Sequence, residues 1–136
     1  MMVTLNPYIS FRDNARAALE RYREVLGGDL QIMTFGSMPD MGYDPSESEL
    51  VMHGQLTTED GMVLMASDTP SRMEYQAPQG VSVSISGTES DRLRAIWAGL
   101  LDGGTATMQL APAPWGGDFG MLVDRFGVAW MVSIDT

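Results

Sequence analysis

The sequence contains no cysteine, no lysine and no long apolar run among its 136 residues. The absence of cysteine excludes disulfide bonds and thiolate chemistry, and it agrees with a cytoplasmic location. No apolar stretch approaches the roughly 20 residues that a membrane-spanning helix needs. Residues 1–6 lack the basic segment and the apolar stretch of a secretory signal. We therefore expect a cytoplasmic protein that has no membrane partner.

Positive charge is also scarce in this chain. Eight arginines stand against 18 acidic residues, which gives a formal net charge of −10. Nucleic acids bind to clustered basic side chains, so this charge would repel them and we expect no nucleic-acid partner. The hydrophobic fraction of 44% is typical of a globular protein, and the length suits a single domain over residues 1–136.

Two segments have the apolar spacing of an amphipathic helix, and each ends in a Gly-Gly pair. The first segment follows Asp13-Asn14, and the second follows a capping-box sequence at residues 88–91. Their apolar positions are Ala15, Ala18, Leu19, Tyr22, Val25 and Leu26, and then Leu93, Ile96, Trp97, Leu100 and Leu101. The Gly-Gly pairs, at 27–28 and 103–104, lie about 76 positions apart, which indicates an internal repeat.

Segments with strand character surround both helices at matching positions. Before the helices, apolar residues alternate with polar ones, with Leu5, Ile9 and Phe11 predicted inward in one half and Val81, Val83 and Ile85 in the other. Further strands are predicted at 29–33, 49–56 and 62–67, and at 105–109, 119–123 and 128–133. About ten extra residues of the first half form a predicted loop at 36–48. The chain therefore reads β-α-β-β-β twice, and a ferredoxin-like fold has too few strands to fit.

Several segments resemble PhnB-like proteins, a branch of the glyoxalase/bleomycin-resistance/dioxygenase (vicinal oxygen chelate) superfamily. They are residues 6–11, 18–28, 51–56, 65–68 and 115–130, the last reading WGGDFGMLVDRFGVAW. The resemblance implies an α+β fold in which two βαβββ modules form a cup-shaped, mostly antiparallel sheet with helices on its outer face. Module one would span about 1–69 and module two about 79–136. Members of the superfamily commonly dimerise, so a homodimer is expected.

PhnB-like proteins are often called ubiquinone-pathway methyltransferases, but the sequence does not favour that activity. A typical methyltransferase holds its cofactor on a Gly-rich turn between a strand and a helix. The chain has no such turn, and it is too short for a doubly wound sheet beside two βαβββ modules.

Metal-using members of the superfamily bind the ion through His, Gln or Glu on the first and last strands of the modules. Here the polar faces of the first strands carry Asn6, Tyr8 and Ser10, and Ser82, Ser84 and Ser86. The last strands are expected to present Met65 or Ser67, and Trp130 or Val132. None of these is a histidine or a carboxylate, the ligands that divalent metals prefer. No cofactor is therefore predicted, and His53 is the one residue that would bind a divalent metal if one is present.

Five residues are the candidates for binding a ligand: Tyr8, His53, Gln55, Ser84 and Trp115. His53 is the only histidine, on a strand where Leu50, Met52 and Leu56 are predicted to face the core and Val51 to share the face of His53. A hydrogen-bonded structural histidine is the competing interpretation. Tyr8 and Trp115 are also consistent with core packing, and Asp68 and Asp124 with capping of turns.

Three functions fit these observations, and they leave open whether the protein is an enzyme. The favoured one is a metal-free protein that binds a small organic molecule, as bleomycin-resistance proteins do. The second is a metal-dependent lyase, isomerase or dioxygenase of the same superfamily. The third is a structural dimer whose cleft is filled by its own side chains.

Overall fold

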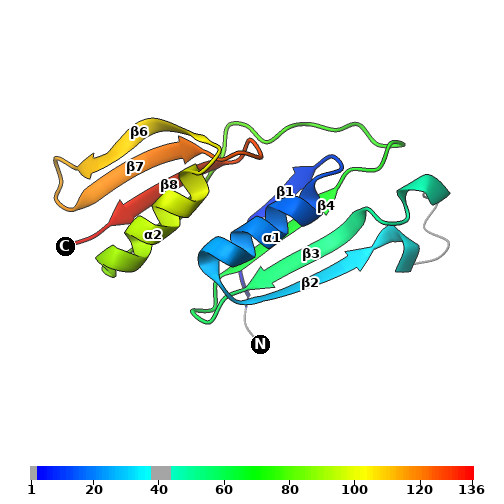
Figure 1. Ribbon diagram of the computed structural model, residues 1–136, viewed down its shortest axis with the longest axis horizontal. Coiled ribbons are helices and arrows are strands. Elements are labelled where there is room, and N and C mark those ends of the chain that lie inside the picture. The colour runs from blue at the N-terminus through cyan, green and yellow to red at the C-terminus, as the bar shows by residue number, and fades with distance from the viewer. Residues whose placement is uncertain (1–2, 38–43) are drawn as a thin grey trace. The chain divides into compact units, whose positions relative to one another are not determined.

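The computed structural model describes residues 3–37 and 44–136. The chain forms two compact modules, Met1–Ala77 and Pro78–Thr136. Within the described residues, each module contains one α-helix and one four-stranded mixed sheet, in the order β-α-β-β-β, so the predicted α+β repeat is confirmed (Figure 1). Neither helix in the described part of the chain has the length and hydrophobicity that crossing a membrane requires.

The first module is built from β1 (Tyr8–Phe11), α1 (Ala15–Leu26), β2 (Asp29–Thr34), η1 (Phe35–Ser37), η2 (Pro45–Glu47), β3 (Val51–Thr57) and β4 (Val63–Asp68). Its strand order is β1-β4-β3-β2, in which β1 and β4 are parallel and the other pairs are antiparallel. Helix α1 covers one face of this sheet (Figure 1). We call the opposite face the open face of the first sheet. Part of the predicted loop at 36–48 lies outside the described residues.

The second module repeats this plan with β5 (Ser82–Gly87), α2 (Ser90–Leu101), β6 (Thr105–Pro112), β7 (Asp118–Val123) and β8 (Ala129–Ile134). Its strand order is β5-β8-β7-β6, again with one parallel pair, β5 with β8. Helix α2 packs against β8, β5 and β7. The two sheets therefore have the same topology, as a duplicated module requires.

Both predicted helices are confirmed, and their buried residues are those of the apolar stripes. Gly27, with a φ of 78°, follows α1, and Gly103, with a φ of 81°, lies just after α2. These positive φ angles explain why a glycine follows each helix, as the C-cap of α1 and one residue after the Asp102 C-cap of α2. The predicted capping box is wrong, because Glu89 precedes α2 without a side-chain hydrogen bond to the helix.

The first strands are shorter than predicted. Leu5 is 99% exposed and precedes β1, while Val81 is 78% exposed and precedes β5. Both residues were predicted to face inward, and that prediction is wrong. The inward alternation begins only where the parallel partner strand supports it, with Ile9 opposite Ala66 and Ile85 opposite Val132.

A glycine under each helix allows the helix to approach the sheet closely. A Cβ atom on Gly54 of β3 would overlap Leu19 of α1, and one on Gly120 of β7 would lie 2.7 Å from Trp97 of α2. The core of each module therefore forms between its helix and the helix-facing side of its sheet. Trp130 and Val132 belong to this core, being 1% and 0% exposed. The expectation that one of them faces the cleft is wrong.

Candidate functional site

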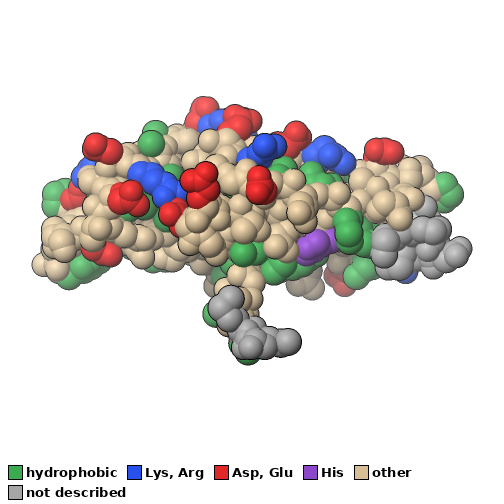
Figure 2. Space-filling view, turned by 90° about the horizontal axis from the view of Figure 1, so that it is seen from below, with side chains coloured by type: hydrophobic (Ala, Val, Ile, Leu, Met, Phe, Trp, Pro, Cys, Tyr) green, Lys and Arg blue, Asp and Glu red, His purple; other side chains and the backbone are tan. Residues whose placement is uncertain are grey.

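The open face of the first sheet holds the one histidine of the chain in contact with an aromatic residue. Tyr8 Oη on β1 and His53 Nδ1 on β3 are joined by a hydrogen bond of 3.1 Å, whose donor depends on the imidazole tautomer. The two rings are tilted by 37°, with centroids 5.6 Å apart. Tyr8 is 50% exposed and His53 is half-buried. Figure 2, in which histidine is purple, shows the imidazole at the surface beside green hydrophobic side chains.

An irregularity in the sheet next to His53 changes which neighbouring side chains share this face. Met33 of β2 pairs with His53, but the next residue, Thr34, pairs with Val51, so Met52 has no partner on β2. Such a bulge reverses the alternation of side chains beyond it. Val51 is consequently 0% exposed and in the core, whereas Met52 is only half-buried. The prediction from the sequence was the reverse, with Met52 facing the core and Val51 on the face of His53.

Residues on neighbouring strands complete the surroundings of the pair. Met65 of β4 is the cross-strand partner of both Tyr8 on β1 and Gln55 on β3. Gln55 is half-buried and donates to Thr57 Oγ1 at 3.3 Å. Met33, the neighbour of His53, is 43% exposed. The face therefore combines one imidazole, one phenol and one amide with two thioethers, a mixture of polar and apolar groups suited to a small organic ligand.

Two of the predicted ligand-binding residues, Ser84 and Trp115, lie in the second module. Ser84 is exposed on β5, opposite Met131 of β8. Trp115 lies in the turn between β6 and β7 and is 71% exposed, with its ring packed edge-on against Phe119 at 5.6 Å between centroids. These two residues remain predictions, as do Tyr8, His53 and Gln55, although the first sheet brings the latter three together.

The two aspartates that were interpreted as turn-capping residues both accept buried hydrogen bonds, those of Asp68 from distant segments and those of Asp124 within its own hairpin. Asp68, which is 4% exposed, accepts from the backbone N–H of Ala15 and of Val51, both at 2.9 Å. It thereby fixes the start of α1 and the bulged end of β3. Asp124, 6% exposed, accepts from the N–H of Phe126 and from the Trp130 indole, both at 2.8 Å.

The metal site of the superfamily does not fit the residues present. No group of three or more His, Asp or Glu side chains within residues 3–37 and 44–136 could hold a metal ion. His53 is the only imidazole on the open face of the first sheet, and Tyr8 already engages one of its two nitrogens. The positions in β7 that match His53 and Gln55 are Phe119 and Met121.

A family model described as 3-demethylubiquinone-9 3-methyltransferase matches residues 4–133. The chain belongs to this family. Protein YjdN of Escherichia coli (strain K12) is 25% identical over 141 residues, covering 96% of this chain and 94% of the relative. Protein PA1353 from Pseudomonas aeruginosa is 33% identical, with a TM-score of 0.87 and 98% of each chain covered.

More distant structures show the fold. A PhnB protein from Bacillus cereus, 19% identical, has a TM-score of 0.77 over 97% of this chain and 99% of the other. A glyoxylase/bleomycin resistance protein/dioxygenase domain from Frankia sp. EAN1pec, 13% identical, has a TM-score of 0.68 over 100% of this chain and 99% of the other. The predicted PhnB-like, vicinal oxygen chelate fold is therefore confirmed. Its two small mixed sheets differ from the doubly wound sheet of a typical dinucleotide-binding enzyme.

Arg72, which was not among the residues predicted from the sequence, lines a pocket on the open face of the first sheet. It lies in residues 70–79, outside the segments that carry the family resemblance. The only signal in the sequence was an arginine two residues after Pro70, and nothing there connects it with β1 or β3.

Proposed function

We propose that the protein binds a small organic molecule on the open face of the first sheet, without a catalytic metal. The observation that carries this proposal is the hydrogen-bonded pair of Tyr8 and His53 beside the thioethers of Met33 and Met65. Because Tyr8 engages Nδ1, the imidazole is held in one orientation and its Nε2 edge stays available to a ligand. The phenol and imidazole rings offer apolar faces, while Gln55 and Nε2 offer hydrogen bonds.

The metal-dependent alternative rests on His53 alone, and metal content distinguishes it. We expect protein purified without chelators to contain less than one equivalent of Zn, Ni, Mn or Fe per chain by mass spectrometry. His53→Ala should leave that content unchanged. About one equivalent of metal per chain that is lost in His53→Ala would contradict the metal-free binding function and favour the lyase, isomerase or dioxygenase alternative.

The binding function itself is tested by nuclear magnetic resonance with a library of small aromatic and aliphatic compounds. Ligands should shift the resonances of Tyr8, His53 and Gln55. Tyr8→Phe, which keeps the ring and removes the hydroxyl group, should weaken their binding by about threefold to tenfold through loss of imidazole orientation. A library in which no compound shifts these resonances would favour the structural dimer with a self-filled cleft.

A further inference from the structure

Three methionines are neighbours on the open face of the second sheet, which is the face opposite α2. Met121 of β7 is the cross-strand partner of Met108 on β6 and of Met131 on β8. These three strands are adjacent in the sheet (Figure 1). Residues paired in this way point to the same face, with Cβ atoms about 4.5–5.5 Å apart. We call Met108, Met121 and Met131 the methionine row; Ser84 of β5, opposite Met131, ends it.

A distortion of β6 brings Met108 into the methionine row. Ala106 pairs with Leu122, which is 1% exposed and faces α2, so regular alternation would turn Met108 toward the helix as well. The register shifts between Ala106 and Met108 and again between Met108 and Ala111. Bulges of this kind redirect side chains, and this one places Met108 opposite Met121.

The methionine row is not part of the core of the second module. That core lies between α2 and the helix-facing residues of the same strands, such as Leu122 and Trp130, each 1% exposed. Met108, by contrast, is 51% exposed, and Met121 and Met131 are half-buried. Filling of this core therefore does not account for the three thioethers, and a small ion in the solvent can reach them.

We infer that the methionine row binds a soft monovalent metal ion, Cu(I), through its three sulfur atoms. Thioethers select Cu(I), whereas Mg and Mn prefer oxygen ligands and Zn prefers imidazole or thiolate. Methionine has three rotatable bonds, so the outer two side chains can bring their sulfur atoms over Met121. The chain has no cysteine that would compete, and its net charge of −10 attracts cations. This site is separate from the proposed function, which concerns the first sheet.

Ag(I) is the first probe, because it is a soft monovalent ion that is stable in air. In a chloride-free titration of the full chain, Ag(I) should shift the nuclear magnetic resonance signals of three methionine methyl groups out of twelve, those of the methionine row. Cu(I), added without oxygen, should shift the same three signals. Zn(II) should shift none of them.

Substitution by leucine removes a sulfur atom and nearly conserves the volume, so the variants should fold. Loss of a residue behind the ligands of a metal site already weakens binding by about tenfold to 100-fold. Met121→Leu, which removes a ligand itself, should therefore weaken Ag(I) binding by at least about tenfold. Met73→Leu is the matched control, since Met73 is 55% exposed in the first module, and it should leave the affinity unchanged.

The pH dependence separates the methionine row from His53, the one imidazole of the chain. Thioethers do not titrate, so the Ag(I) affinity should stay constant between about pH 8 and pH 5, whereas binding to an imidazole weakens as the pH falls. Binding that weakens in this range, or that shifts the signals of His53 in place of those of the row, would overturn the inference. So would the absence of saturable Ag(I) binding, or equal losses in Met121→Leu and Met73→Leu.

Discussion

The hairpin turn that joins β3 to β4 and the one that joins β7 to β8 make the same backbone hydrogen bonds around different side chains. Thr58 N donates to Met62 O at 2.9 Å, and Asp124 N donates to Val128 O at the same distance. In the first module, Thr58 Oγ1 accepts from one backbone N–H, that of Met62. In the second module, the Asp124 carboxylate accepts from two backbone N–H groups and from the Trp130 indole.

The open faces of the two sheets also carry different side chains, with the polar pair on the first sheet. The first sheet carries the polar pair of Tyr8 and His53, whereas the matching positions of the second sheet are Ser84 and Phe119. The repeat thus preserves what the backbone geometry requires, such as the glycines under the helices, and varies the side chains on both faces. Both modules bury polar side chains, Thr58 and Asp68 in the first and Asp124 in the second, so the clearest difference between the open faces is the Tyr8–His53 pair of the first sheet.

The largest expected effect tests the turn of the second module against that of the first. Asp124→Ala leaves three buried or half-buried N–H donors without their acceptor, so it should lower the free energy of unfolding by about 3 kcal/mol. Thr58→Ala removes one acceptor and should cost about 1 kcal/mol. Urea unfolding measures both. Circular dichroism follows each variant, and fluorescence reports the second module, which contains all three tryptophans.

Asp124→Asn is the control for this comparison, because it keeps the shape and one acceptor oxygen. Its destabilisation should fall between those of Asp124→Ala and Thr58→Ala. If Asp124→Ala and Thr58→Ala lower the free energy of unfolding equally, the indole bond and the extra backbone bond of Asp124 do not stabilise the second turn. The two turns would then not differ in stability.

A smaller effect is expected from the glycines under the two helices. A Cβ atom in Gly120→Ala would lie 2.7 Å from the Trp97 ring and 2.9 Å from Cα of Leu110, a backbone atom that yields little. In Gly54→Ala the clash is with the end of the Leu19 side chain, which can change rotamer. Overpacking of this kind should cost about 2 kcal/mol for Gly120→Ala and about 1 kcal/mol for Gly54→Ala. Thermal and urea unfolding check the order, and the reverse order would show that Leu19 is the more rigid neighbour.

The repeat explains how much of the molecule could be predicted. Helices and hairpins follow from local periodicity and glycine stops, so their order and the fold were predictable from residues such as Gly27 and Gly103. The orientation of Val51 and Met52 was not, because the bulge depends on pairing with β2 and on Asp68, which is remote in sequence. Trp130 or Val132 was expected on the cleft side, and the buried hydrogen bond from the Trp130 indole to Asp124 was missed because Asp124 was interpreted only as a turn residue.

The candidate site was predictable only in part, because it also depends on contacts between segments that are distant in sequence. Tyr8 and His53 were named separately as polar residues of alternating strands, but their hydrogen bond requires β1 and β3 to lie on either side of β4. Arg72 was not predictable, because its place in the pocket depends on the contacts of Thr69, Ser71 and Met73 with distant residues.

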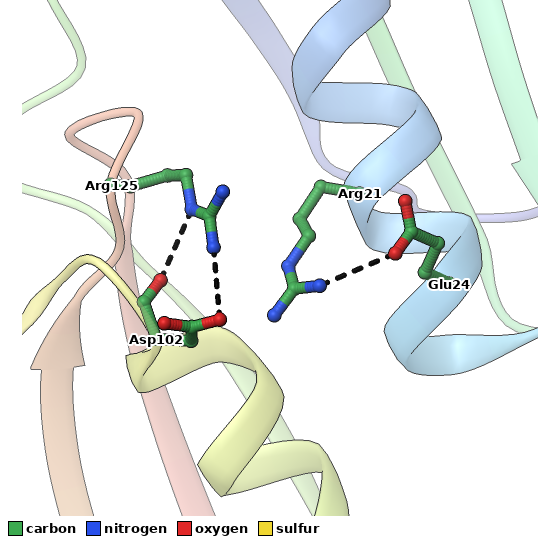
Figure 3. A network of polar contacts seen from close by, with 4 residues as sticks. All are labelled: Arg21, Glu24, Asp102 and Arg125. Carbon is green, nitrogen blue, oxygen red and sulfur yellow. Dashed lines mark hydrogen bonds and ion pairs between the residues drawn. The ribbon is translucent and has the colours of Figure 1, made fainter.

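The smallest expected effect compares one exposed ion pair in each module. Arg21 of α1 pairs with Glu24 one turn along the same helix at 3.3 Å, while Arg125 of the β7–β8 turn reaches Asp102 after α2 at 3.2 Å (Figure 3). Arg125 also donates through Nε to the carbonyl of Asp102 at 3.1 Å, so it joins two elements, whereas Glu24 supports only its own helix.

Because exposed pairs contribute little, Glu24→Gln should lower the free energy of unfolding by about 0.3 kcal/mol and Arg125→Gln by about 1 kcal/mol. Urea unfolding at low and high salt separates the two contributions: the loss in Glu24→Gln should vanish at high salt, and that in Arg125→Gln should persist through the carbonyl contact. Equal salt dependence of both losses would contradict the role of that carbonyl in holding the turn of the second module.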